Sequence, residues 1–175
     1  VAVKLFRDAG TVTDGDPAHE IDVGSALTHD NVIRVLGATP RPQLGLVLEL
    51  LQLDKTPGGG GWGELGKPPN FDTCARDTYP EGTTWGAPFV LRALGGVAAA
   101  CAHLHAQHFS HGDLYAHNTM VKAPYGEPKV GDFGAAYRYG GGEAFDDDDA
   151  ALIETIELRA FGCLAEELVA RMAAP

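Results

Sequence analysis

The chain has little of two things, cysteine and positive charge. Its 175 residues include three cysteines, which are scattered and form no C-x-x-C pair. This argues against a cysteine-based metal site and fits reduced thiols. Lysines and arginines number 13 against 24 aspartates and glutamates, which gives a formal net charge of −11 and a pI of about 4.9. The acidic balance argues against nucleic acid or an anionic membrane as a partner.

Membrane and export signals are also missing. No uninterrupted apolar run approaches the roughly 20 residues of a membrane span, and no signal-peptide pattern opens the chain. We therefore expect a soluble, cytoplasmic protein without a membrane partner. His103, His105 and His108 lack the H-E-x-x-H spacing of a zinc site and are expected to be solvated or capping side chains. The acidic run at 146–149 is expected to precede a helix, where carboxylates interact favourably with the dipole.

Two short motifs carry most of the information in the chain. Residues 111–118 read HGDLYAHN and residues 131–134 read GDFG. Phosphoryl transfer from ATP needs one carboxylate that orients and deprotonates an acceptor hydroxyl, and further oxygen ligands that hold Mg²⁺. Asp113 suits the first task, and Asn118 and Asp132 suit the second. The sequence therefore indicates phosphoryl transfer that depends on ATP and Mg²⁺.

With these motifs the chain resembles the protein kinases. The opening VAVK is similar to the family's V-A-I-K strand, and HDNVI at 29–33 is similar to its H-P-N-I-V turn. The resemblance implies that Lys4 contacts the α- and β-phosphates and pairs with a helix glutamate, for which Glu20 is the candidate. Asp113, Lys4 and Glu20 are thus the predicted catalytic residues.

The same resemblance predicts where the nucleotide binds. The segment GLVLELL at 45–51 would run into the hinge between the lobes, with Leu48 as the gatekeeper and the backbone that follows it facing the adenine. The residues predicted to bind ATP are Ala2, Lys4, Leu48, Glu49, Leu50, Leu51 and Met120.

Other strings resemble a narrower group. YPEGT at 79–83 and RAFGCL at 159–164 look like bacterial protein kinases whose kinase domain follows leucine-rich repeats. The chain carries no such repeat, so the resemblance implies either a catalytic portion whose repeat region lies elsewhere in a longer gene product or a stand-alone relative. The family's Gly-rich loop, Ala-Pro-Glu element and later helices also have no counterpart here, so we expect a partial kinase domain.

The predicted fold is α+β, a two-lobed kinase-like fold. A small β-rich N-lobe without its first strands would span 1–53, and a truncated helical C-lobe would span 54–175. Strands are expected at 1–5, 33–38, 45–51, 119–121 and 129–130, and helices at 17–28, 91–107 and 151–172. The Gly- and Pro-rich connector at 54–72 is expected to have no regular structure.

One glycine departs from the family's pattern in the predicted core. Gly24 stands where a bulky side chain of the regulatory helix would complete a stack with Val35, Phe133 and His111. A glycine there is expected to leave a void and to weaken the helix. The lysine–glutamate pair would then be loose.

Two departures lie in the motif at 111–118. Gly112 replaces the arginine that grips a phosphorylated activation loop, so we expect no such switch. Tyr115 and His117 occupy the positions where peptide kinases place a Lys or Arg near the transferred phosphate. Tyr115 has no charge, so that positive charge is either absent or replaced by His117.

Three functions remain open on these observations. The acceptor could be a Ser/Thr, or Tyr, hydroxyl of a protein substrate or of the chain itself, which VAVK and HDNVI favour. A small-molecule acceptor is the second alternative, because H-G-D-x-x-x-x-N also occurs in aminoglycoside and choline phosphotransferases. A catalytically weak or inactive pseudokinase, acting as a binding module, is the third.

Overall fold

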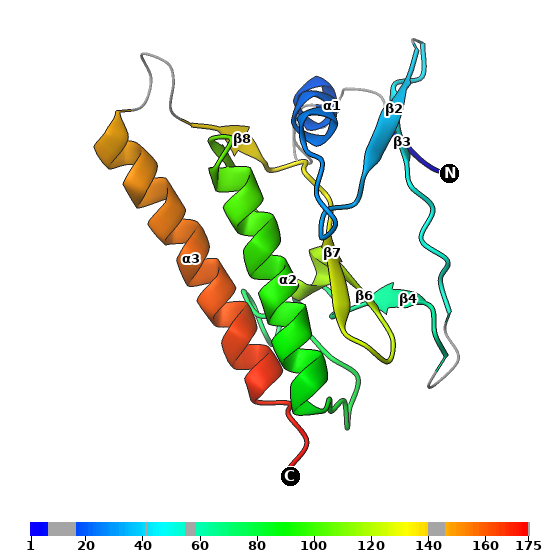
Figure 1. The fold of residues 1–175 in the computed structure, drawn as a ribbon, viewed down its shortest axis with the longest axis vertical. Helices are drawn as coiled ribbons and strands as arrows, with labels where there is room; N and C mark the ends of the chain where they lie inside the picture. The colour runs from blue at the N-terminus through cyan, green and yellow to red at the C-terminus, as the bar shows by residue number, and fades with distance from the viewer. Residues whose placement is uncertain (7–16, 41, 55–58, 140–145, 175) are drawn as a thin grey trace.

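The computed structural model describes residues 1–6, 17–40, 42–54, 59–139 and 146–174 (Figure 1). It is an α+β arrangement of small antiparallel sheets and three α-helices. The first sheet has the order β1-β3-β2, the second has the order β4-β6-β7, and β5 pairs with β8. The strands are β1 (Ala2–Leu5), β2 (Val35–Thr39), β3 (Gly45–Leu48), β4 (Trp62–Glu64), β5 (Phe109–Ser110), β6 (Thr119–Lys122), β7 (Glu127–Val130) and β8 (Tyr137–Arg138).

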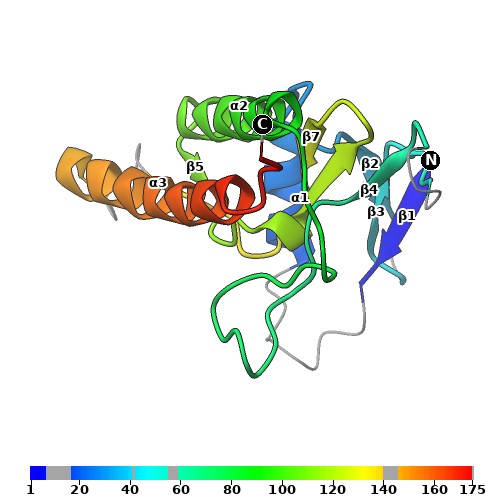
Figure 2. The same ribbon diagram turned by 90° about the horizontal axis from the view of Figure 1, so that it is seen from below.

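The helices are α1 (Pro17–Ala26), α2 (Ala87–His105) and α3 (Asp147–Val169), with a short 3₁₀ turn at Ala116–Asn118. Helix α1 contacts β2, while α2 lies along β7 and beside α3. Two views show the sheet of β1, β2 and β3 on one side of the molecule and the pair of long helices on the other (Figures 1 and 2). The division into lobes at 1–53 and 54–175 remains a prediction.

The two larger sheets are joined by the segment that precedes β2. The amide of Ile33 donates to the Val130 carbonyl at 2.8 Å, and the amide of Val130 donates to the Asn31 carbonyl at 2.8 Å. The Asn31 side chain also donates to the Pro128 carbonyl at 2.9 Å. These bonds fix the end of β7, and with it the GDFG segment that follows, relative to the first sheet.

Helix α2 begins four residues before the predicted start at 91. Gly86 is its N-cap residue and Pro88 lies in its first turn, where a missing N–H costs nothing. The apolar stripe that the sequence predicts for this helix is only partly its buried face, because Leu91 and Ala98 are exposed. That stripe consists of Leu91, Leu94, Val97, Ala98, Cys101 and Leu104. The buried residues of the helix are Val90, Ala93, Val97, Ala100, Cys101 and Leu104.

Helix α2 also bears on the expectation that no segment could span a membrane. Among the described residues it is the one helix that is long and apolar enough for a span by length and composition. Arg92 interrupts its apolar sequence, and its buried face forms part of the main core cluster. Core helices of proteins that do not enter membranes can have the same length and apolar composition.

Helix α3 likewise starts earlier than the predicted residue 151. Asp146 is its N-cap: its carboxylate accepts the Asp149 amide at 2.9 Å, and the Asp149 carboxylate faces the Asp146 amide. This reciprocal capping box satisfies donors that the helix leaves free at its N-terminus. The acidic run is therefore a helix start, as predicted, but part of it belongs to the helix itself.

The connector prediction was wrong at one point. Residues 62–64 form β4, which pairs antiparallel with β6 in the register Trp62–Lys122, Gly63–Val121 and Glu64–Met120. The partner strand lies far away in sequence, so the local glycine and proline content could not reveal the pairing. The other predicted strands and helices are present, with ends shifted by up to four residues.

The predicted void at Gly24 is also absent from the structure. Gly24 is buried, and a Cβ placed on it would lie 2.7 Å from Val35 Cγ2. The β-branched Val35 side chain therefore fills the space that a larger residue would occupy. As a result α1 approaches β2 closely, which favours a fixed position for Glu20 on the same helix.

Candidate active site

The HGDLYAHN segment lies between β5 and β6, and its two ends are held by strand pairing. Asp113 and Asn118 meet within it: the Asn118 side-chain amide donates to Asp113 Oδ2 and to the Asp113 carbonyl, both at 2.9 Å. The Gly131 amide donates to the Asn118 carbonyl at 2.9 Å and so ties this loop to the GDFG segment. The amide nitrogen of Asn118 is thus occupied, which leaves its oxygen available as a ligand.

Three segments converge on Lys4. Its ammonium group donates to Glu20 Oε1 at 2.7 Å and to Asp132 Oδ1 at 2.9 Å. Glu20 comes from α1, Lys4 from β1, and Asp132 from the turn after β7. The predicted loose pair was therefore wrong: the Lys4–Glu20 ion pair is formed, and Glu20 is 4% exposed.

Electrostatics in this cluster follow from burial and pairing. Burial alone would lower the pKa of Lys4, but its hydrogen bonds to Glu20 and Asp132 outweigh burial and raise it. Burial works against ionised Asp132 too, yet the bond and charge of Lys4 bring its pKa below the usual value. For Glu20, burial raises the pKa and Lys4 offsets part of that rise. A raised lysine pKa and a lowered aspartate pKa each favour the charged form of the group. Lys4 and Asp132 therefore form an ion pair in which both partners are charged.

The residues present suit Mg²⁺. The ion takes oxygen ligands and is usually held by one or two carboxylates together with substrate phosphates, and not by an all-protein cage. Asp132 offers a half-exposed carboxylate and Asn118 a free amide oxygen. Within the described ranges, no group of three or more His, Cys, Asp or Glu side chains is placed to hold a metal by itself. A two-ligand site completed by phosphate oxygens fits this arrangement.

The predicted nucleotide residues fall on both main sheets. Ala2 pairs directly with Leu48 across β1 and β3, whereas Met120 lies on β6 opposite Lys129. The Lys129 ammonium group donates to Glu49 Oε1 at 2.7 Å and so connects the sheets next to the predicted hinge.

Part of the predicted hinge backbone is already hydrogen-bonded within the protein. The Glu49 amide donates to the Arg34 carbonyl at 3.0 Å, and the Glu49 carboxylate accepts the Arg34 amide at 2.8 Å. In the part of the chain that the structure describes, the Leu51 amide makes no hydrogen bond, so it is available to a ligand. Leu50 is exposed and Leu51 half-buried.

A buried glutamate that the sequence did not assign anchors the start of the HGDLYAHN segment. Glu157 of α3 is 4% exposed, and its Oε1 accepts the amides of His111 at 2.6 Å and Gly112 at 3.1 Å. The same oxygen accepts the Ser110 hydroxyl at 2.9 Å, and Oε2 meets His105 Nε2 at 2.6 Å. One carboxylate thus fixes the backbone immediately before Asp113.

The Glu157–His105 pair predicts a pH-dependent stability. The hydrogen bond to Glu157 raises the pKa of His105 above 6.5, so this contribution is complete below that pH and is lost as pH rises through the raised value. Burial opposes ionised Glu157, but its bonds to His105, Ser110 and the Gly112 amide lower its pKa below 4.5. Its contribution is therefore complete above 4.5 and is lost as pH falls through the lowered value.

We expect the Tm difference between the parent and His105→Gln to be largest between pH 4.5 and 6.5 and to shrink at higher pH. Thermal melts at about pH 5.5 and about pH 9 measure this difference. An equal difference at both pH values would mean that His105 acts without its charge.

His111, the first residue of the HGDLYAHN segment, is a packing residue. His111 is fully buried, and its ring lies 5.2 Å from that of Phe133. Nε2 donates to the Gly131 carbonyl at 3.0 Å, and Nδ1 accepts the Asp113 amide at 3.3 Å. Both ring nitrogens are satisfied by the neutral form, and burial lowers the pKa of His111.

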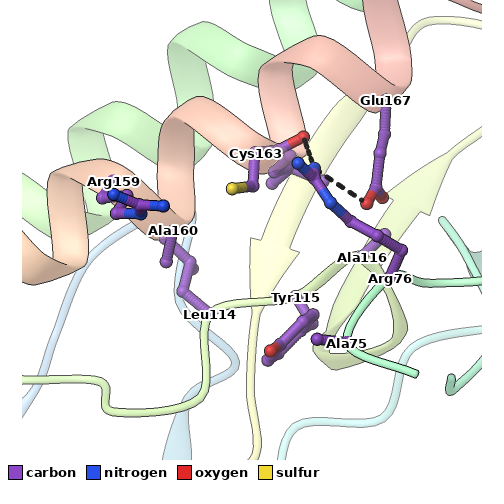
Figure 3. A pocket seen from close by; sticks show the side chains of 10 residues that line it. Ala75, Arg76, Leu114, Tyr115, Ala116, Arg159, Ala160, Cys163 and Glu167 are labelled. Atoms are coloured by element: carbon purple, nitrogen blue, oxygen red, sulfur yellow. Dashed lines mark hydrogen bonds and ion pairs between the residues drawn. The ribbon is translucent and has the colours of Figure 1, made fainter. Parts of the chain in front are cut away.

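A cavity of about 280 Å³ opens beside the loop, between α3 and the segment that contains Ala75 and Arg76 (Figure 3). Tyr115 and Leu114 form its loop side, while Cys163 and Glu167 belong to α3. Arg76 crosses its edge, donating to the Cys163 carbonyl at 3.1 Å. The cavity therefore lies directly next to the segment that carries Asp113.

The sequence model of the protein tyrosine and serine/threonine kinase family matches residues 1–152. No curated protein matches the chain. The matched range includes every residue that the sequence placed in the site, and it ends within α3, just before Glu157.

Proposed function

The chain belongs to the protein tyrosine and serine/threonine kinase family, and from this premise we propose that it transfers the γ-phosphoryl group of ATP to a hydroxyl group of a protein. The observation that carries the proposal is the convergence of Glu20, Lys4 and Asp132 from three separate segments, at 2.7 and 2.9 Å. A phosphate-binding cation and a metal-binding carboxylate must share one site in this chemistry.

In this mechanism Lys4, oriented by Glu20, binds the α- and β-phosphates. A bound nucleotide would compete with the Lys4–Asp132 ion pair, so that Lys4 would be free to bind phosphate and Asp132 to hold the metal. Asn118 would be the second protein ligand. When bound, Mg²⁺ neutralises charge on the phosphates.

The acceptor side of the reaction belongs to Asp113. Its carboxylate accepts a hydrogen bond from the Asn118 amide, which fixes the carboxylate while leaving an oxygen for a substrate. Asp113 orients the acceptor hydroxyl for in-line attack and takes its proton. Positioning and electrostatic stabilisation supply most of the acceleration in such reactions.

The adenine would lie against Leu48 and the backbone from Glu49 to Leu51, with Ala2 and Met120 completing the pocket. The free Leu51 amide supports this placement, because an adenine ring needs a backbone donor for one of its nitrogens. Ala2 and Leu48 are direct neighbours in the sheet, which places both near one end of the hinge.

The finer assignments belong to the same proposal. We assign the acceptor to Ser/Thr, with Tyr as the alternative, on a protein substrate or on the chain itself. We assign the protein to the cytoplasm. Its net charge of −11 supports a protein that avoids nucleic acid and anionic membranes. A relation to bacterial kinases with leucine-rich repeats rests on sequence strings alone and is tested by the gene's flanking sequence.

Asp132→Asn tests the metal assignment. We expect the affinity for ATP in the presence of Mg²⁺ to fall at least about tenfold, because an amide replaces a charged ligand. The affinity without Mg²⁺ should change little. Isothermal titration of ATP with and without Mg²⁺ measures both values.

The matched control is Asp22→Asn, which removes an exposed carboxylate from α1. It should bind nucleotide like the parent. If Asp132→Asn kept the parent's Mg²⁺-dependent affinity, Asp132 would not be a metal ligand and the site would need another carboxylate.

A further inference from the structure

The cavity of about 280 Å³ beside the HGDLYAHN segment has no role in the mechanism above. Its volume lies below the range of about 300–1,000 Å³ that is usual for small-molecule pockets, so it suits a side chain of a larger partner. Half of its lining is small or apolar, and these residues are Ala75, Leu114, Ala116, Ala160 and Leu164. An apolar lining with a few polar side chains is typical of a site that holds part of a ligand.

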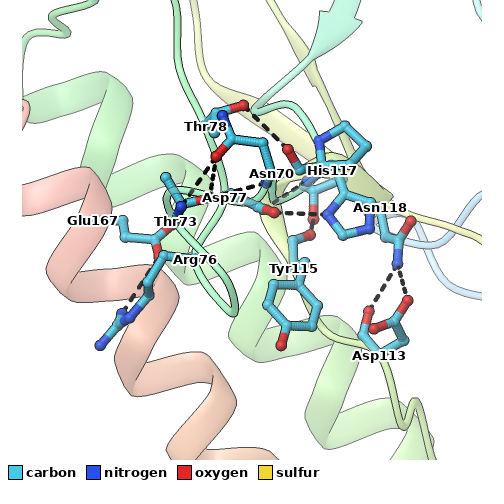
Figure 4. Close-up of polar contacts among 12 residues, drawn as sticks. Asn70, Thr73, Arg76, Asp77, Thr78, Asp113, Tyr115, His117, Asn118 and Glu167 are labelled. Atoms are coloured by element: carbon cyan, nitrogen blue, oxygen red, sulfur yellow. Dashed lines mark hydrogen bonds and ion pairs between the residues drawn. The ribbon is translucent and has the colours of Figure 1, made fainter.

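The cavity lies within reach of an acceptor held at Asp113. Leu114 and Tyr115, which directly follow Asp113, form its loop side. Figure 4 shows Tyr115 between Asp113 and Arg76, which lines the cavity on the other side. Successive residues of an extended peptide lie about 3.3 Å apart. A peptide whose hydroxyl reaches Asp113 would therefore bring a neighbouring side chain to the cavity.

The wall formed by Ala75 and Arg76 is fixed to the HGDLYAHN segment. Asp77, the next residue, is 4% exposed, and its Oδ2 accepts the backbone amide of His117 at 3.0 Å. Arg76 itself donates to the Cys163 carbonyl of α3 at 3.1 Å. These bonds connect the wall both to the loop and to α3, so the cavity is formed before any ligand enters.

Two of the three charged side chains in the lining neutralise each other. Arg76 donates to Glu167 Oε1 at 3.4 Å, and Glu167 also accepts the Tyr79 hydroxyl at 2.8 Å. Arg76 makes a second ion pair, at 3.2 Å, with Glu166, whose side chain is 75% exposed and does not line the cavity. Arg76 and Glu167 therefore have little charge left for a ligand.

Arg159 is the third charged side chain, and it has no counter-ion among the residues that the structure describes. Figure 3 shows Arg159 and Arg76 on opposite sides of Cys163. Arg159 is the only lysine or arginine of α3. No carboxylate lies three or four positions from it on the helix, where the residues are Thr155, Ile156, Gly162 and Cys163. The lining thus contains one unpaired positive charge.

We propose that this cavity binds an acidic side chain of the acceptor protein, close to the residue that is phosphorylated, and that Arg159 selects it. The inference builds on the proposed kinase function, because it names the class of acceptor. A guanidinium group can hold a carboxylate through two parallel hydrogen bonds, and the acceptor's carboxylate supplies the counter-ion that Arg159 lacks. The apolar lining contacts the methylene groups of the same Asp or Glu side chain.

The rest of the chain repels acidic peptides. Its net charge is −11, so the field of the whole protein favours basic partners. A preference for acidic residues beside the acceptor would therefore come from a local contact. This makes such a preference a specific sign of the cavity.

Kinetics with ATP, Mg²⁺ and three peptides tests the proposal. Each peptide has one central acceptor, Ser in one set and Tyr in a second, flanked on both sides by Asp, by Asn or by Lys. We expect kcat/KM for the Asp peptide to be about tenfold above that for the Asn peptide, the lower end for a hydrogen bond to a charged group. The difference should lie in KM for the peptide. Arg159→Gln should remove it, whereas Arg92→Gln, the same change at an exposed arginine of α2, should keep it.

Charge reversal separates selection from a structural role. Arg159→Glu should make the Lys peptide the best substrate, because a carboxylate then lines the cavity. A purely structural role of Arg159 would lower the rate for all three peptides alike. Arg159 is exposed and makes no hydrogen bond within the described ranges, so neither substitution should change the Tm.

Equal kcat/KM for the Asp and Asn peptides in the parent would overturn this inference and leave the proposed function intact. An Asp preference that Arg159→Gln retains would do the same. If no peptide were phosphorylated, the proposed function would fall, and fluorescence anisotropy with peptides that carry Ala at the acceptor position would decide on the cavity. Tighter binding of the Asp peptide, lost in Arg159→Gln, would support the site, and equal binding of the Asp and Asn peptides would overturn it.

Discussion

Asp113→Asn is expected to abolish phosphoryl transfer while ATP binding persists. General-base catalysis contributes about 100- to 10,000-fold to a rate, and an amide cannot accept the hydroxyl proton. The asparagine oxygen can still accept the Asn118 amide, which the Asp113 carboxylate holds at 2.9 Å, so the loop should remain ordered. Transfer of labelled γ-phosphate and a thermal-shift titration with ATP measure the two properties separately.

Asp30→Asn is a suitable control, because it changes an exposed aspartate outside the site. It should transfer phosphate like the parent. A rate in Asp113→Asn equal to that of the parent would show that another group is the base. Loss of both transfer and ATP binding would instead mean that Asp113 is needed for the shape of the site.

Glu157→Gln is expected to destabilise the protein by about 3–5 kcal/mol, the range for breaking a buried ion pair by removing one partner. The substitution removes the charge opposite His105. It also turns an NH₂ group toward a site that holds four donors, those of Ser110, His111, Gly112 and His105. Since these bonds fix the backbone before Asp113, transfer should fall as well. Urea denaturation gives the change in the free energy of unfolding.

Glu154→Gln is the matched control on the same helix. Glu154 accepts one hydrogen bond, from the Tyr139 hydroxyl at 2.7 Å, so its loss should cost about 1 kcal/mol. Equal destabilisation by the two variants would mean that Glu157 contributes no more than an ordinary hydrogen-bonded glutamate. The loop would then be held by other contacts.

Residues carried by motifs could be predicted from the sequence. The order VAVK, HGDLYAHN and GDFG selected Lys4, Asp113, Asn118 and Asp132 as candidates, and the structure brings Lys4 to Asp132 and Asn118 to Asp113. Helix α2 was found because its apolar residues recur at helical spacing. In both cases the signal is local or set by a fixed spacing.

Other parts of the site depend on contacts that no local pattern encodes. Glu157 and Asp77 are single carboxylates in unremarkable surroundings, and their partners lie 46 and 40 residues away. Only burial distinguishes them from surface acids. Strand β4 was missed for the same reason, because β6 supplies its pairing.

The error at Gly24 has a different origin. The missing side chain was taken as missing volume, but the Val35 side chain occupies the space that the glycine leaves. Val35 Cγ2 would lie 2.7 Å from a Cβ at this position, so the closeness of α1 and β2 depends on the glycine. A gap in a family pattern therefore predicts a void only when the surrounding elements are held apart.

The most direct test of the central claim is transfer of label from γ-phosphate-labelled ATP by the purified chain with Mg²⁺. The proposed mechanism predicts label on protein, dependent on Mg²⁺ and absent with Asp113→Asn. Label found only on small hydroxyl compounds would move the acceptor to the small-molecule class. No label on any acceptor, with ATP binding intact, would contradict catalysis and identify a nucleotide-binding module.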